Sequence, residues 1–157
     1  MNAQEDAVPI VQQIRDQLPE AVRAGDTRQR DILRLLIAAF DNVRIAARHE
    51  LSDDEAITTL QREAKQRRDS IEQYRAGGRD DLVRHEQDEL DFIVALLPAE
   101  LSPEELTAMV SAVIAEVGAA GPKDMGKVMG SLVKRVAGRA DGAQVSALVR
   151  EQLANLT

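Results

Sequence analysis

Residues 52–98 have the sequence SDDEAITTLQREAKQRRDSIEQYRAGGRDDLVRHEQDELDFIVALLP, which predicts two helices joined by a tight turn. Ser52-Asp53-Asp54-Glu55 is a capping box that opens the first helix, and Gly77-Gly78 ends it. Asp80 or Asp81 begins the second helix. The first helix has one narrow apolar face, made by Ile57, Leu60, Ala64, Ile71 and Tyr74. We therefore expect a long antiparallel hairpin.

Two further helices are predicted before this hairpin. The first spans about 9–24, and Pro19 should kink or split it because proline cannot donate to the helical ladder. Gly25 ends this helix, and Asp26 is the expected N-cap of the next, at about 27–48. The second helix is apolar over much of its circumference, so we expect it to be central and contacted from several sides. Its apolar residues are Ile32, Leu33, Leu35, Leu36, Ile37, Phe40, Val43 and Ile45.

The segment from Pro98 to Leu101 is the predicted domain boundary. Ser102-Pro103-Glu104-Glu105 is a second capping box, with proline at the first helical position, and Gly118 ends the helix that it opens. A short helix to about Ala137 and a final helix after the turn at 138–142 complete the chain.

These patterns predict an all-α protein, because no alternating apolar pattern typical of strands occurs. We expect an N-terminal four-helix domain over residues 1–97, which contains the long hairpin. A small C-terminal three-helix domain should occupy residues 98–157.

Composition excludes several classes of function. The 157 residues include no Trp, one Tyr and two Phe, so the core must be aliphatic. Because Cys is absent, there is no disulfide, thiolate metal ligand or cysteine nucleophile. The polar, acidic opening is unlike a signal peptide, and no apolar run has the length of a membrane span. We therefore predict a soluble cytoplasmic protein with no membrane partner.

The search for catalytic or metal-binding groups finds one weak candidate. His85 has Asp81, Asp88 and Glu89 at helical spacing, but one imidazole among carboxylates on a charged helix is more typical of ordinary side-chain pairing. The other histidine, His49, is interpreted as a surface residue. No serine has a nucleophile-elbow context. The sequence therefore predicts no catalytic residue, no metal ligand and no cofactor.

Two glycines in Gly126-Lys127-Val128-Met129-Gly130 invite comparison with phosphate-binding loops. Their spacing matches neither the Walker nor the Rossmann pattern, and no strand precedes them. We interpret them instead as small residues that let this helix pack closely against a neighbour.

Basic residues cluster in two places. The cluster at 62–68 alternates with acids, and Glu63–Arg67 and Arg68–Glu72 are interpreted as solvated pairs. The cluster at 122–139 contains a single acid, Asp124, and its basic members are Lys123, Lys127, Lys134, Arg135 and Arg139. These five are the candidate nucleic-acid-binding residues, with backbone amides at the helix starts as further phosphate donors. The alternative is a solvated charged face.

Net charge is −7, which argues against the whole molecule being a nonspecific nucleic-acid binder. The charge is unevenly spread. Residues 1–97 contain 14 basic and 20 acidic side chains, whereas residues 98–157 contain 6 and 7. The second part is therefore the better place to look for a phosphate-binding surface.

Several stretches resemble the GatB/YqeY family, in particular its stand-alone YqeY-like branch, and the resemblance runs from about residue 27 to 153. The stretches are Leu33-Arg34-Leu35-Leu36-Ile37-Ala38-Ala39, residues 60–71, Ala76-Gly77-Gly78-Arg79-Asp80-Asp81-Leu82, Leu96-Leu97-Pro98, residues 123–130 and Gly138-Arg139-Ala140-Asp141-Gly142. The same helical and tail domains end the B subunit of the glutamine-dependent transfer RNA (tRNA) amidotransferase, where the tail is implicated in holding tRNA.

The resemblance implies a non-catalytic, tRNA-associated binding module. The amidotransferase's chemistry belongs to a cradle domain that no part of this chain matches. A carbon–nitrogen ligase activity with glutamine as amido donor is therefore implied only by inheritance, or for a complex. The alternative is an adaptor that binds a cytosolic synthetase or amidotransferase component.

Overall fold

The protein was analysed as a computed structural model that describes residues 8–156. Over these residues it contains seven α-helices, one 3₁₀ turn and no strand, so the all-α prediction is confirmed for the described part of the chain. The chain divides into two compact units, Met1–Leu97 and Pro98–Thr157. Within the described residues, no helix combines the length and apolarity that a bilayer span requires.

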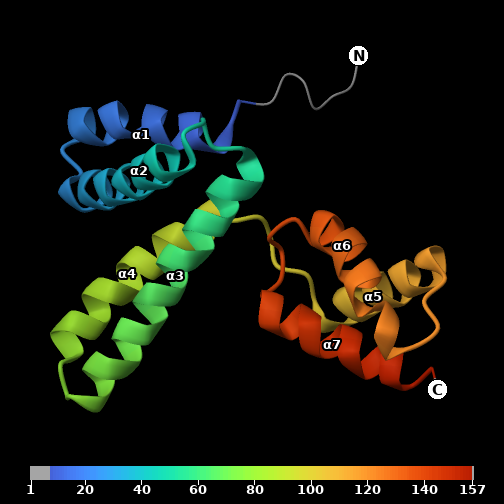
Figure 1. Ribbon diagram of the computed structural model, residues 1–157. Helices are drawn as coiled ribbons and strands as arrows, with labels where there is room; N and C mark the ends of the chain where they lie inside the picture. The colour runs from blue at the N-terminus through green and yellow to red at the C-terminus, as the bar shows by residue number, and fades with distance from the viewer. Residues whose placement is uncertain (1–7, 157) are drawn as a thin grey trace. The chain divides into compact units, whose positions relative to one another are not determined.

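The first unit contains α1 (Ile10–Ala24), α2 (Thr27–Ala47), α3 (Asp53–Ala76) and α4 (Asp80–Leu96). Figure 1 shows α3 and α4 side by side and antiparallel, joined by the turn at Gly77 and Gly78. The pair formed by α1 and α2 lies at the end of the hairpin where α3 begins.

Capping interactions define where these helices begin. The carboxylate of Asp26 accepts from the Gln29 amide at 3.0 Å, as predicted for an N-cap. The capping box of Ser52 and Glu55 is present with both of its hydrogen bonds. The Ile10 amide donates to Asp53 Oδ1 at 3.0 Å, so the start of α3 also caps α1.

The core of the first unit is aliphatic apart from Phe40. Its buried residues are Ile14, Ala21, Ile32, Leu33, Leu36, Phe40, Ala56, Leu60, Ala64, Ile71, Leu90 and Ile93. The helix α1 runs through Pro19 as one helix, so the predicted split does not occur, although the proline leaves the Arg15 carbonyl without its usual donor. The helix α2 contacts both α1 and α3, as expected, but Leu35 and Ile45 are 49% and 69% exposed, so its apolar residues are not all buried.

A buried ionic group joins the two helices of the hairpin. Arg67 is only 8% exposed, and its Nε donates to Glu89 Oε2 on α4 at 3.1 Å. Its Nη1 donates to Glu63 one turn earlier on α3. Burial alone would lower the pKa of Arg67, but the hydrogen bonds to the two carboxylates outweigh it and raise that pKa. The solvated Glu63–Arg67 pair expected from the sequence is therefore a buried bridge across the hairpin.

The second unit contains α5 (Pro103–Val117), the 3₁₀ turn η1 (Pro122–Asp124), α6 (Met125–Val136) and α7 (Gly142–Ala154). The capping box of Ser102 and Glu105 opens α5, and Gly118 ends it with a positive φ of 66°. The three helices enclose a second aliphatic core, made by Leu106, Val110, Val113, Ile114, Val128, Leu132, Val136, Val145, Val149 and Leu153.

Candidate nucleic-acid interface

The basic cluster at 122–139 spans η1, the whole of α6 and the turn after it. The helix α6 buries Val128, Leu132 and Val136 at four-residue spacing, so the side of the helix that carries these residues packs against the core. The opposite face is exposed to solvent. The side chains on that face are the ones available to a ligand.

Three lysines share this exposed face, and we name it the lysine face. Lys123 lies on η1, and Lys127 and Lys134 lie on α6. All three are exposed, and none forms a salt bridge with a residue in the described part of the chain. Lys127 and Lys134 are seven residues apart, so they lie on the same side of the helix about 10 Å apart along its axis. The lysine face is thus an extended row of exposed positive charge, and Lys127 within it interacts electrostatically with Asp124.

The two arginines of the cluster have structural partners. Arg135 makes a two-pronged ion pair with Glu116 of α5, through Nη1 to Oε1 at 3.0 Å and Nη2 to Oε2. The hydrogen bonds from Arg135 lower the pKa of Glu116. Arg139 is half-buried, and its Nε donates to the Ala99 carbonyl at 2.8 Å. The acid that pairs with Arg135 therefore lies outside the 122–139 segment, on α5.

The glycines of α6 do not pack against a neighbouring helix. Gly126 and Gly130 lie on the exposed side of the helix, and a Cβ added to either would meet nothing within 4 Å. The packing interpretation was wrong because these positions lie opposite the buried row of Val128 and Leu132. Their effect is to leave the helix backbone uncovered beside the lysine face, a feature that a helical projection of the sequence would have revealed.

The start of α6 has an acidic residue of its own. Asp124 Oδ2 accepts from the Ala120 amide at 2.8 Å, and this bond lowers the pKa of Asp124, with a further contribution from Lys127. The Ala120 amide is thus already engaged by a carboxylate.

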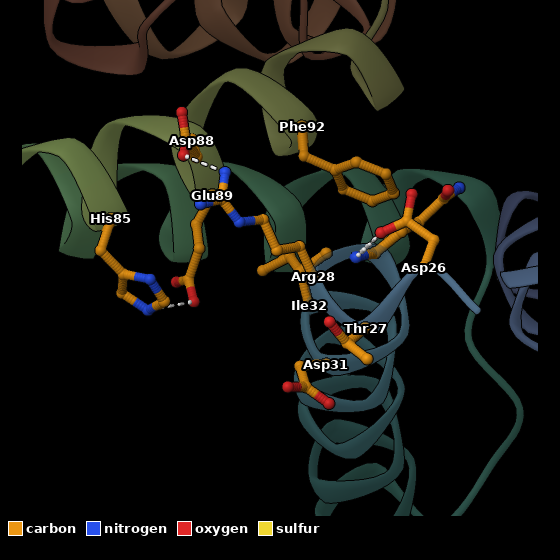
Figure 2. Close-up of a pocket in the computed structure, with 10 residues that line it drawn as sticks. Asp26, Thr27, Arg28, Asp31, Ile32, His85, Asp88, Glu89 and Phe92 are labelled. Atoms are coloured by element: carbon orange, nitrogen blue, oxygen red, sulfur yellow. Dashed lines mark hydrogen bonds and ion pairs between the residues drawn. The ribbon is translucent and has the colours of Figure 1, made fainter. Parts of the chain in front are cut away.

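A separate pocket of about 370 Å³ lies in the first unit between the start of α2 and α4. Figure 2 shows His85, Asp88, Glu89 and Phe92 along one wall, facing residues 26–32. Three residues of the weak metal candidate, His85, Asp88 and Glu89, line this pocket, but they pair with different groups. His85 Nε2 lies 3.3 Å from Glu89 Oε1, and Asp88 pairs with Arg28 at 3.2 Å.

The fourth residue of that candidate points to another partner. Asp81 pairs with Arg79 at 3.2 Å, and Glu89 also accepts from the buried Arg67. Among the residues that the structure describes, no group of three or more His, Cys, Asp or Glu side chains is placed to hold a metal ion. His85 and Glu89 thus pair within α4, whereas Asp88 and Glu89 also pair with arginines of α2 and α3.

With the two units described, the chain can be compared with known proteins. The family model described as "Yqey-like protein" matches residues 11–153. The chain belongs to the YqeY-like family. The match covers both units and includes the hairpin, the buried Arg67 bridge and the lysine face.

Curated relatives of this YqeY-like chain come from fungi. It is 34% identical over 107 residues to altered inheritance of mitochondria protein 41, mitochondrial, of Eremothecium gossypii, a match of 66% of the chain and 58% of that protein. Its identity to the same-named protein of Saccharomyces cerevisiae is 32% over 81 residues, 51% of the chain and 44% of the relative. The Pyrenophora tritici-repentis protein is 26% identical over 146 residues, 90% of the chain and 80% of the relative.

The YqeY-like chain thus spans about half the length of the first two relatives. Their names place those proteins in the mitochondrion. The cytoplasmic location expected for this chain stays a prediction.

Proposed function

We propose that this YqeY-like protein is a binding module without catalysis of its own, and that it holds tRNA through the lysine face of α6. The observation that carries the proposal is the exposure of Lys123, Lys127 and Lys134 on one side of the second unit, without salt bridges to described residues. Lysines that neutralise phosphates release condensed counterions, which supplies affinity without base recognition.

The composition of the surface supports contact with the RNA backbone. Both Phe residues and the single Tyr lie in the first unit, so the second unit itself has no aromatic side chain for base stacking. Gly126 and Gly130 have no side chains to hold a ligand away from the helix. A folded RNA recognised by shape and phosphates fits this surface better than an unpaired strand that needs stacking.

Charge reversal on the lysine face tests the proposal. The triple substitution Lys123→Glu, Lys127→Glu and Lys134→Glu should weaken binding of purified tRNA and flatten the salt dependence, by about 0.7 to 0.9 in the log–log slope for each phosphate that the variant no longer neutralises. The matched control is Arg150→Glu, which reverses one exposed charge on α7, a helix that carries none of the three lysines. Circular dichroism would verify that each variant is folded.

Other outcomes would redirect the proposal. If the wild-type protein does not retain tRNA at low salt, the tRNA hypothesis is refuted. A complex from native cells that survives nuclease and high salt would instead favour the adaptor, bound to a cytosolic synthetase or amidotransferase component. Glutaminase or ATPase activity in the pure protein would favour the carbon–nitrogen ligase, and we expect neither.

We propose that the protein binds tRNA in the cytoplasm. A mitochondrial location, by analogy with the relatives named above, is the alternative. Fractionation of native cells decides between them.

A further inference from the structure

The pocket between the start of α2 and α4 has no role in the proposed tRNA contact, which belongs to the second unit. Its volume of about 370 Å³ lies within the range that is typical of small-molecule sites. All of its lining residues come from the first unit, and Figure 2 shows two segments far apart in the sequence facing each other across it. The pocket is therefore formed within one compact unit.

The apolar part of the pocket is made by Ile32 and Phe92. Ile32 is buried, whereas Phe92 is only half-buried, and Figure 2 shows its ring projecting from α4 toward the start of α2. The other phenylalanine of the chain, Phe40, is 1% exposed in the core. An aromatic ring that keeps access to a pocket can stack on a flat apolar ligand or face a cation.

The polar part of the pocket is acidic. The lining contains four acids, two from the start of α2 and two from α4: Asp26, Asp31, Asp88 and Glu89. Its basic side chains are Arg28 and His85, so acids exceed bases by at least two (4 − 2). Asp26 caps the start of α2, which is the end of a helix that would otherwise favour an anion.

The partners of these acids do not reverse the balance. Arg30 pairs with Asp31 at 2.8 Å, and Arg67 pairs with Glu89 at 3.1 Å while sharing its charge with Glu63. With Arg30, Arg67 and Glu63 included, five acids (4 + 1) face at most four bases (2 + 2). The pocket therefore favours a cation over an anion of the same shape.

Asp88 is the acid best placed to receive a ligand. It lies four residues before Phe92 on α4, so the two side chains share one side of the helix about one turn apart. Asp88 pairs with Arg28 Nη1 at 3.2 Å, and the side chains of Arg28 and Asp88 are 88% and 59% exposed. Because so exposed an ion pair is weak, another cation can displace the guanidinium at little cost. Arg28 thus occupies the position that a ligand's cation would take.

We propose that this pocket binds a small organic cation, an ammonium group on a flat apolar body, with the ammonium against Asp88 and the body against Phe92 and Ile32. The helical spacing of Asp88 and Phe92 places the two contacts roughly 5–6 Å apart, which sets the length of the ligand. Arg28 competes for the same carboxylate and opposes binding. A bare metal ion does not suit the site, since no metal-holding group of three such side chains occurs within residues 8–156.

Tryptamine is a suitable probe, because a short carbon chain joins its indole ring to an ammonium group. Tryptophol, with a hydroxyl in place of the ammonium, and indole-3-propionate, with a carboxylate, are the matched ligands. In amide NMR titrations of the full-length protein, tryptamine should shift resonances of residues 26–32 and 85–92 with a Kd on the order of 1 mM. Tryptophol should bind at least about threefold more weakly, and indole-3-propionate more weakly still. Absence of shifts at about 10 mM tryptamine, or equal binding of tryptophol, would refute the proposal.

Two variants distinguish a ligand site from ordinary pairing of α2 with α4. Asp88→Asn should weaken tryptamine binding by at least about threefold, whereas Arg28→Ala should strengthen it about two- to threefold, since it frees the carboxylate and removes a like charge. A pair that served structure alone would not give opposite effects. The control Asp91→Asn neutralises an exposed acid of α4 that does not line the pocket, and should leave the Kd unchanged.

Weaker binding by Arg28→Ala, or an unchanged Kd for Asp88→Asn, would overturn the assignment of Asp88 as the ligand's partner. No RNA is present in these titrations, so their result is independent of the tRNA proposal.

Discussion

Replacing Arg67 with Met isolates the contribution of the buried ionic group that joins α3 and α4. Methionine retains most of the aliphatic volume and removes both charged hydrogen bonds, to Glu89 on α4 and to Glu63 on α3. The two carboxylates would then share a site with little water, since their side chains are 15% and 17% exposed.

The loss in the free energy of unfolding depends on the two carboxylates that remain without their arginine. Breaking a fully buried ion pair by removing one partner costs about 3–5 kcal/mol, because a buried charge loses its compensation. Here the remaining carboxylates keep some access to water, and Glu89 retains His85 at 3.3 Å, so we expect the lower end, about 3 kcal/mol. If the free energy of unfolding falls by about 2 kcal/mol per molar urea, the urea concentration at the midpoint of unfolding should decrease by roughly 1.5 M.

Urea unfolding followed by the fluorescence of Tyr74 measures this loss. Tyr74 is the single tyrosine of the chain and lies in α3, so it reports on the hairpin. The matched control is Arg68→Met, which alters the exposed neighbouring arginine and should change stability by less than about 0.5 kcal/mol. Replacing all three members, Glu63→Leu, Arg67→Met and Glu89→Leu, should restore much of the loss. If Arg67→Met costs no more than Arg68→Met, the inferred role of the bridge is wrong.

Three further predictions follow from the helices. Gly126→Ala and Gly130→Ala should each stabilise the second unit by about 0.5–1 kcal/mol in thermal unfolding, since the added methyl meets no atom and glycine is unfavourable in a helix; a destabilised variant would contradict this. Pro19→Ala restores a donor within α1 and should stabilise the first unit by up to about 3 kcal/mol; an unchanged melting temperature would count against it. The Ser102 amide lowers the pKa of Glu105 below its usual 4.5, so the capping box stabilises α5 above that pH and loses this effect as pH falls through the lower folded-state pKa. The stability difference between wild type and Glu105→Gln, which keeps an acceptor but cannot titrate, should therefore shrink in acid, and a difference that is constant from pH 7 to pH 2 would refute this assignment.

The features that could be predicted from sequence depend on residues close together in the chain. The capping boxes at Ser52 and Ser102 and the left-handed glycine at Gly118 each need only four or five consecutive residues. They set where helices begin and end, so the helix boundaries and the all-α class followed from them. The apolar spacing within each helix then identified most of the core.

The features that were missed depend on the relative position of distant segments. Arg67 was assigned to a solvated pair because its second partner, Glu89, is 22 residues away and meets it only through the hairpin register. Leu35 and Ile45 were expected to be buried because they are apolar residues of a largely apolar helix. Their exposure was missed because the sequence does not reveal how many neighbouring helices cover that helix. For the candidate site, the lysines could be found by composition, but the pairing of Arg135 with Glu116 required the packing of α5 against α6.

The distribution of charge explains how an acidic protein can present a phosphate-binding surface. Of the net −7, the residues up to 97 contribute −6 (14 − 20) and the rest contribute −1 (6 − 7). In the second unit Glu116 is paired with Arg135, whereas Asp124 keeps its negative charge, since the Ala120 amide and Lys127 lower its pKa. Exposed charges are screened over about 10 Å at 0.1 M salt, so charges close to the three lysines act on a bound phosphate more strongly than the net charge does. The proposed affinity for tRNA therefore depends on three local lysines rather than on net charge.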